Sequence, residues 1–156
     1  MALRSLVLAL AVSALAIAQK YSGPTPPKPD LIYIQHAQTL VVTELVQAKE
    51  NKQKDDTVYI IDGPNSSART PLALPIFLVK TDKLIPERLI LYRLKSADGH
   101  REISLAAKRL NADPIHVDVV KIDANFYKLT VYDGLDPGEY ALSPADSNLH
   151  FCFQVY

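Results

Sequence analysis

Residues 135–142, Leu-Asp-Pro-Gly-Glu-Tyr-Ala-Leu, constrain the fold more than any other stretch of this chain. They lie between two strand-like runs, residues 127–132 and 149–156. Proline presets φ at about −65° and glycine adopts a positive φ without a Cβ clash, so Asp-Pro-Gly favours a tight turn. Glu-Tyr-Ala-Leu then begins a new extended segment. The stretch predicts a hairpin at the closing edge of a β-sandwich, and it indicates no reaction.

Short apolar, β-branched and aromatic runs recur along the rest of the chain, separated by turn residues. In residues 115–122 apolar side chains largely alternate with polar ones, the period of a half-buried strand. In residues 57–61 and 88–94 both faces are apolar, which is typical of central strands or of a sheet covered by a partner. Strands recurring every eight to twelve residues are typical of a sandwich or barrel. We expect an all-β fold, an antiparallel Ig-like β-sandwich of about nine or ten strands.

The first eighteen residues have the pattern of a signal peptide. Arg4 provides the positive n-region, residues 5–15 form an apolar h-region, and Ala-Ile-Ala at 16–18 is an A-x-A cleavage site. We expect cleavage after Ala18 and a secreted or periplasmic protein. The apolar run is shorter than a spanning helix requires, so no transmembrane segment is expected after cleavage.

Residues 19–29 are rich in proline and predict an extended, polyproline-like linker. Residues 30–156 then form the β-sandwich domain, whose size suits a single domain. The chain carries 17 Lys and Arg and 17 Asp and Glu, and the signal peptide contains one of the arginines, so the mature protein is close to neutral. A basic excess on one face would mark a nucleic-acid binder, so no nucleic-acid partner is expected.

Two local features complete the composition. Basic residues cluster between Lys49 and Lys54, but neighbouring acids dilute them, and the run predicts a solvated loop. Cys152 is the only cysteine, so the fold depends on packing and not on an intramolecular disulfide. A single thiol in an oxidising compartment is either buried and inert or paired between chains.

The pattern Leu-x-Pro-Gly-x-Tyr-x-Leu, in residues 135–142, resembles the penultimate hairpin of extracellular and periplasmic Ig-like or transthyretin-like modules. There the tyrosine buries its ring and its hydroxyl meets backbone at a corner. The end of the chain also resembles uncharacterised secreted bacterial β-sandwich proteins in which a PGEYAL hairpin precedes a Phe-x-Phe strand. The resemblance implies a structural role, and no activity, for the residues that carry it: Pro137, Gly138, Tyr140, Phe151 and Phe153.

Metal binding is the sharpest chemical hypothesis. His116 and Asp118 are two apart on one predicted strand, as are His150 and Cys152 on another, so each pair lies on one face. Were the two strands neighbours, four ligands suited to zinc or copper would converge. No C-x-x-C or H-E-x-x-H spacing accompanies them. The alternative to a metal site is that the polar side chains are exposed on their strands and the thiol is buried.

A hydrolase is a weaker hypothesis. Ser66 and Ser67 lie in a breaker-rich loop from Gly63 to Pro71, but no G-x-S-x-G elbow and no phosphate-binding glycine loop occur. Glu139, beside Tyr140, is expected to point outward. We therefore expect no enzyme activity and no cofactor.

The sequence favours a non-catalytic structural or interaction module with an envelope or extracellular protein partner. Such a partner could add a strand to an open sheet edge. A small metal- or ligand-binding sandwich is the second hypothesis, and a hydrolase with its site in the loop from Gly63 to Pro71 is the third.

Overall fold

The all-β prediction is confirmed by the computed structural model, which describes residues 20–54, 56–106 and 113–156. These residues form fourteen strands and one 3₁₀ turn, Pro86–Arg88. In the described ranges there is no helix with the length and apolarity needed to cross a membrane. The predicted signal peptide, residues 1–18, lies outside the described residues.

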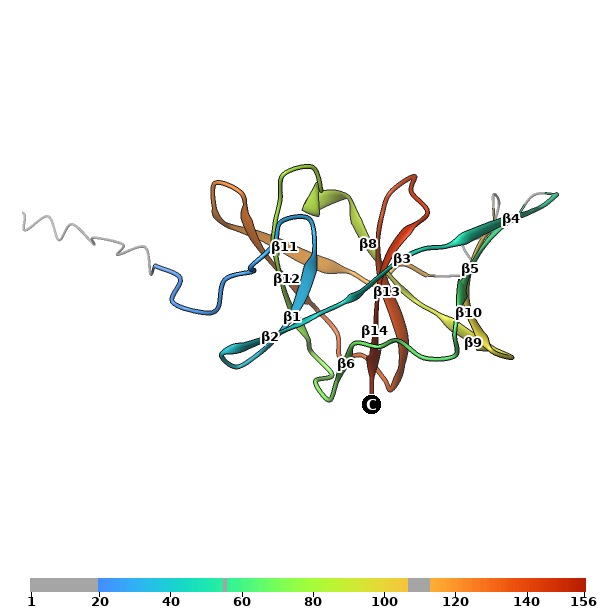
Figure 1. Ribbon diagram of the computed structural model, residues 1–156, viewed down its shortest axis with the longest axis horizontal. Coiled ribbons are helices and arrows are strands. Elements are labelled where there is room, and N and C mark those ends of the chain that lie inside the picture. The colour runs from blue at the N-terminus through green and yellow to red at the C-terminus, as the bar shows by residue number, and fades with distance from the viewer. Residues whose placement is uncertain (1–19, 55, 107–112) are drawn as a thin grey trace, which may run out of the picture.

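The strands form three sheets, arranged side by side in Figure 1. The first sheet has the order β11 (Val117–Asp123), β12 (Phe126–Val131), β7 (Ile76–Lys80), β1 (Ile32–His36), β2 (Thr39–Val42). The middle sheet has β3 (Glu44–Gln47), β14 (Leu149–Val155), β13 (Gly138–Pro144), β8 (Leu89–Arg93), with β6 (Arg69–Thr70) parallel to β14. The third sheet has β4 (Lys49–Gln53), β5 (Asp56–Asp62), β10 (His100–Ala106), β9 (Lys95–Ala97).

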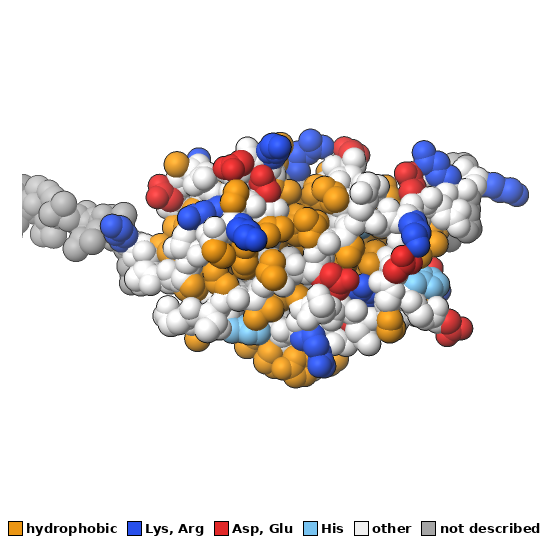
Figure 2. Space-filling model, in the orientation of Figure 1, with side chains coloured by type: hydrophobic (Ala, Val, Ile, Leu, Met, Phe, Trp, Pro, Cys, Tyr) orange, Lys and Arg blue, Asp and Glu red, His pale blue; other side chains and the backbone are white. Residues whose placement is uncertain are grey.

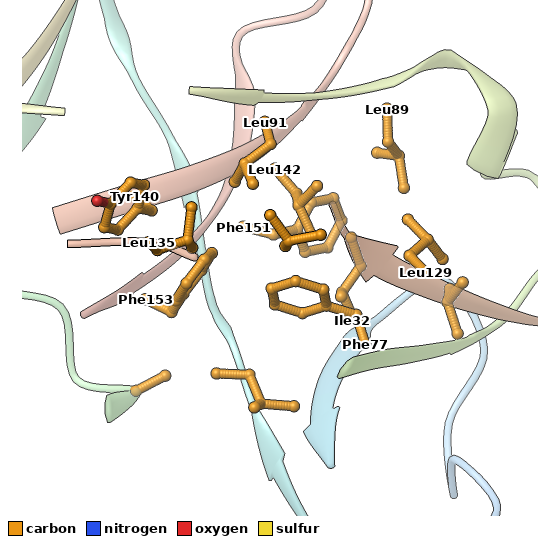
Figure 3. Close-up of a cluster of buried hydrophobic side chains, with 14 of the residues drawn as sticks. Ile32, Phe77, Leu89, Leu91, Leu129, Leu135, Tyr140, Leu142, Phe151 and Phe153 are labelled. Carbon is orange, nitrogen blue, oxygen red and sulfur yellow. The ribbon is translucent and has the colours of Figure 1, made fainter. Parts of the chain in front are cut away.

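The middle sheet is covered on both faces. Because successive side chains of a strand point to opposite faces, β13 and β14 each contribute to two cores. One face packs Tyr140, Leu142 and Phe153 against the first sheet, where Phe77 is fully buried. Figure 3 shows this apolar cluster. The opposite face packs against the third sheet in a smaller cluster: Ala48, Ile61, Tyr92, Leu94, Ile103, Ala141 and Cys152.

One extended segment connects all three sheets. The chain leaves β2 in the first sheet at Thr43, enters β3 in the middle sheet, and passes Ala48 into β4 in the third (Figure 1). At the first crossing the Thr43 amide and hydroxyl donate to the Ile32 carbonyl at 2.9 and 2.8 Å. At the second, the buried Ala48 donates its N–H to the Asn148 carbonyl at 2.8 Å. Residues 39–47 are thus divided between two sheets as β2 and β3, which is one reason the strand number exceeds nine or ten.

The solvated loop expected from Lys49 to Lys54 is wrong, because residues 49–53 form edge strand β4 paired with β5. Charged side chains are common on edge strands, where they discourage pairing with other chains. Lys49 and Lys52 are exposed, and Lys49 donates to Asp62 at 2.7 Å. A charged run therefore did not distinguish an edge strand from a loop.

Residues 132–137 carry the chain from the first sheet to the middle sheet. The hairpin that follows joins β13 to β14, both of which lie inside the middle sheet and not at a closing edge as predicted. Gly138 does not adopt the expected positive φ; instead a Cβ there would lie 3.0 Å from the Arg93 guanidinium. That guanidinium donates to the Pro137 carbonyl at 3.0 Å.

Tyr140 has the geometry of a corner residue. Its ring is 1% exposed and stacks on Phe153 with centroids 5.6 Å apart. Its hydroxyl donates to the Asp136 carbonyl at 2.8 Å, four residues upstream. Phe151 and Phe153 are buried in the same core. The ring therefore packs the two sheets together while its hydroxyl fixes the connection that changes sheets.

The proline-rich segment lies against the first sheet in its described part, residues 20–29. The Tyr21 ring meets Phe126 edge-on at 5.1 Å, and its hydroxyl donates to the Pro24 carbonyl at 2.9 Å. Pro26 is buried. Asp30 then begins the domain by accepting three backbone N–H bonds through one carboxylate oxygen, from Asp82, Lys83 and Leu84.

Substitutions at Tyr140 should separate its two contributions. We expect Tyr140→Ala to lower the free energy of unfolding by roughly 3 to 5 kcal/mol, the cost of deleting a buried aromatic ring. Tyr140→Phe keeps the ring and loses the hydroxyl bond, and it should cost about 1 kcal/mol. Urea denaturation measures both. Unchanged stability of Tyr140→Ala would contradict the corner assignment.

Candidate functional site

Polar side chains are buried between the middle and third sheets, a region we term the interlayer. Its buried polar members are Ser66, Arg101, Glu139, Ser143 and His150. The Cys152 thiol lies in the same layer. The opposite core, against the first sheet, is a larger cluster of apolar side chains, and the buried Thr70 hydroxyl on that side lies 2.9 Å from His36 Nε2. Chemistry inside the described fold is therefore concentrated in the interlayer.

Arg101 on β10 occupies one end of the interlayer and is fully buried. Its guanidinium donates to the carbonyls of Asp62 and Gly63, each at 3.0 Å. It also makes a bidentate pair with Glu44 on β3, at 3.0 and 3.2 Å. Burial disfavours its charge, but Glu44 and Glu139 outweigh burial and raise the pKa of Arg101, which remains a cation. The pairing fastens the third sheet to the middle sheet.

Glu139 on β13 completes this cluster. Its Oε2 accepts from the Ser66 amide at 2.9 Å and from the Ser66 hydroxyl at 2.5 Å, and lies 3.7 Å from Arg101. Its Oε1 has no hydrogen-bond partner among the described residues. The expectation that Glu139 points outward is wrong. It alternates with Tyr140 as predicted, but a third sheet covers the face that it occupies.

Ser66, the serine of the hydrolase hypothesis, is buried inside the same cluster. Its hydroxyl donates to Glu139 and accepts from Arg101 at 2.7 Å. Ser67 donates its backbone N–H to Glu44 at 2.8 Å. Hydrogen bonds of these two serines therefore connect the segment from Gly63 to Pro71 to both the middle sheet and the third sheet.

His150 on β14 lies at the other end of the interlayer and is 2% exposed. Its Nδ1 is 2.6 Å from the Ser143 hydroxyl, and its ring meets Tyr59 edge-on at 5.3 Å. Its Nε2 has no hydrogen-bond partner among the described residues. Burial lowers the pKa of His150 to about 4, so the imidazole is neutral at pH 7. His150 lines a cavity of about 190 Å³ between the sheets.

Cys152 is fully buried in the middle of the interlayer and forms no disulfide. Burial raises the pKa of its thiol to about 12, although nearby Arg101 opposes the shift. The thiolate is the reactive form of cysteine, so this thiol is unreactive at neutral pH. Of the two states considered from the sequence, the structure has the buried one.

The four suggested metal ligands are not brought together. His116 and Asp118 are exposed at the start of β11 in the first sheet, where His116 Nε2 lies 3.1 Å from Asp118 Oδ1. His150 and Cys152 face the interlayer on the far side of the middle sheet. Within the described residues no group of three or more His, Cys, Asp or Glu side chains is placed to hold a metal ion.

Comparison of the chain with protein-family models, curated proteins and solved structures gave no match. The site therefore has to be interpreted from its own geometry. Sequence reasoning missed Arg101, although a signal was present: Arg101 is two residues from Ile103 and therefore shares its face of the strand. A charged residue in phase with apolar ones marks a buried ion pair.

We predict that Arg101→Met lowers the free energy of unfolding by roughly 3 to 5 kcal/mol, because it leaves the buried Glu139 and the partly buried Glu44 without a counter-charge. Arg88→Met is the matched control. Arg88 pairs with Asp146 at 3.1 Å, but both side chains are exposed, so the loss should be at most about 1 kcal/mol. Urea denaturation at pH 7 measures both, and equal losses would contradict the assignment.

His150 should make stability depend on pH. A histidine in the unfolded chain has a pKa of about 6.5, whereas burial holds that of folded His150 at about 4. Between these values the unfolded chain binds a proton that the folded protein does not. The His150 contribution is complete above pH 6.5 and is lost as the pH falls toward 4, by about 3 kcal/mol in total.

Urea denaturation of wild type and His150→Leu across this range isolates the effect. Both proteins carry the same carboxylates, so the difference between their free energies of unfolding reports His150. The stability advantage of the wild type over the variant should shrink toward acid pH. Parallel profiles would show that His150 is not held neutral.

Proposed function

We propose that the protein is an exported, non-catalytic β-sandwich module that binds a protein partner. The proposal combines the predicted signal peptide with one surface observation. Apolar side chains are exposed together at the end of the molecule next to β6, where Figure 2 displays a gathering of hydrophobic atoms. We call Arg69, Leu72, Leu74 and Tyr156 the β6 surface.

Backbone hydrogen bonds hold the β6 surface together. Tyr156 donates its N–H to the Thr70 carbonyl at 3.2 Å, which sets the last residue beside β6. The Arg69 guanidinium lies 4.5 Å from the Tyr156 ring centroid. Leu72 donates its N–H to the Thr70 hydroxyl at 3.1 Å, so the segment that follows β6 turns at this point. These apolar groups are thus presented on fixed backbone.

The composition of the β6 surface suits a protein partner. Leu72 is 41% exposed, Leu74 55% and Tyr156 59%. Tyrosine and arginine are the residue types that most often dominate protein–protein binding energy. Stacking leaves Arg69 preordered, which reduces the entropy lost when a partner binds. An apolar patch with a charged rim is typical of interaction sites.

The interlayer supports a scaffold role for the remainder of the molecule. Ser66, Arg101 and Glu139 are hydrogen-bonded to one another, and each is buried. Cys152 has a thiol held protonated by burial. The hydrogen bonds among these groups connect the middle sheet to the third sheet. A binding surface requires such a rigid scaffold.

Site-specific photo-crosslinking in the producing cells tests the proposal. A photo-reactive residue replacing Leu74 should give a discrete adduct of higher mass. The matched control replaces Val120, which is 49% exposed on β11 of the first sheet, and it should give none. No adduct from position 74, or the same adduct from both positions, would contradict binding through the β6 surface.

A further inference from the structure

The cavity beside His150 lies at the opposite end of the interlayer from Arg101. It has a volume of about 190 Å³ and lies between the third sheet and the hairpin that joins β13 to β14. Tyr59 and Ile103 line it from the third sheet, and Tyr92 lines it from β8. Ser143 and His150 complete its wall.

One buried polar atom in this wall lacks a partner. Nδ1 of His150 is taken by the Ser143 hydroxyl, and Nε2 has no hydrogen-bond partner among the described residues. The side chain is 2% exposed, so bulk water does not satisfy that nitrogen. A buried polar atom without a partner is destabilising, and native proteins seldom leave one unpaired. Nε2 itself contacts almost no free space, so a partner in the adjoining cavity reaches it through a small turn of the imidazole ring.

The size and lining of the cavity define what that partner can be. Apolar protein cavities of about 150 Å³ bind benzene, so a six-membered ring fits here. Two tyrosine rings and Ile103 provide apolar and aromatic contacts for its faces and edges. Among the described residues that line the cavity, the one carboxylate is Asp146, which is exposed and accepts a hydrogen bond from Arg88. A neutral ring is therefore favoured over an ion.

The functional group follows from the imidazole. If the Ser143 hydroxyl donates to Nδ1, Nε2 carries the proton and donates; if Nδ1 donates to Ser143, Nε2 accepts. A hydroxyl group can both donate and accept, so it pairs with either tautomer. Burial lowers the pKa of His150 to about 4, and the neutral ring offers no charge to attract an anion.

We propose that the cavity between the middle and third sheets binds a small, neutral, phenol-like molecule whose hydroxyl pairs with His150 Nε2 and whose ring packs against Tyr59 and Tyr92. This site is separate from the β6 surface. It gives the protein a ligand-binding capacity that does not depend on a protein partner.

Phenol and benzene are the probes, and thermal unfolding with titration calorimetry is the measurement. Phenol should raise the unfolding temperature of the wild type in a saturable manner. His150→Leu should bind phenol roughly fivefold more weakly, the effect of one lost hydrogen bond, and should bind benzene at least as well. His116→Leu, which removes an exposed imidazole, should leave both affinities unchanged.

Two results would overturn the proposal. One is no saturable effect of phenol on the wild type, which would mean that the cavity holds water only. The other is an equal loss of phenol and benzene binding in His150→Leu, which would mean that His150 is not the polar partner. If His150→Leu does not fold, nitrogen NMR of the wild type decides: phenol, but not benzene, should shift the His150 Nε2 signal saturably, and no shift would overturn the proposal.

Discussion

The burial of the middle sheet on both faces is the constraint on which the rest of the structure depends. A sheet with one solvent-exposed face tolerates polar residues at alternate positions. In β13 and β14, however, most side chains on both faces are buried against another sheet. Toward the first sheet the solution is an apolar core built on Phe77, Tyr140 and Phe153. Toward the third sheet the strands carry Glu139, Ser143 and His150, so polar groups had to be paired inside the protein.

Arg101 determines how that pairing is achieved at one end. A buried cation has a large desolvation cost, which only close pairing and complete hydrogen bonding offset. Arg101 meets both requirements, with Glu44 from the middle sheet and two carbonyls near the end of β5. Glu44 lies just after the crossing at Thr43, so the ion pair also fixes where the extended segment changes sheets. Pairing and topology therefore support each other.

Each end of the interlayer has one buried polar atom without a hydrogen-bond partner among the described residues, Glu139 Oε1 at one end and His150 Nε2 at the other. At the Arg101 end, hydrogen bonds pair the guanidinium, the Ser66 hydroxyl and Glu139 Oε2, and the cluster forms a rigid connection between the middle and third sheets. At the His150 end, the nitrogen that lacks a partner in the described part of the chain belongs to a side chain that lines a cavity. The many hydrogen bonds of the first end rigidify the fold, whereas the second end has an unpaired group next to a cavity that can hold a ligand. This contrast separates the structural role of the first end from the binding role that we propose for the second.

The sequence by itself determined the all-β class, most strand positions and the tyrosine at the corner. The class and the strand positions follow from local chemistry, which is period-two alternation and turn residues. The corner tyrosine follows from the resemblance of residues 135–142 to the hairpins of Ig-like modules. Only the tertiary structure decided that there are three sheets, that residues 39–53 pass through all of them, and that Glu139 and Arg101 face each other. The physical reason is that alternation assigns each side chain to a face of its strand, but it contains no information about what covers that face. Glu139 was assigned to the correct face, and the third sheet, built from residues distant in the sequence, made that face an interior.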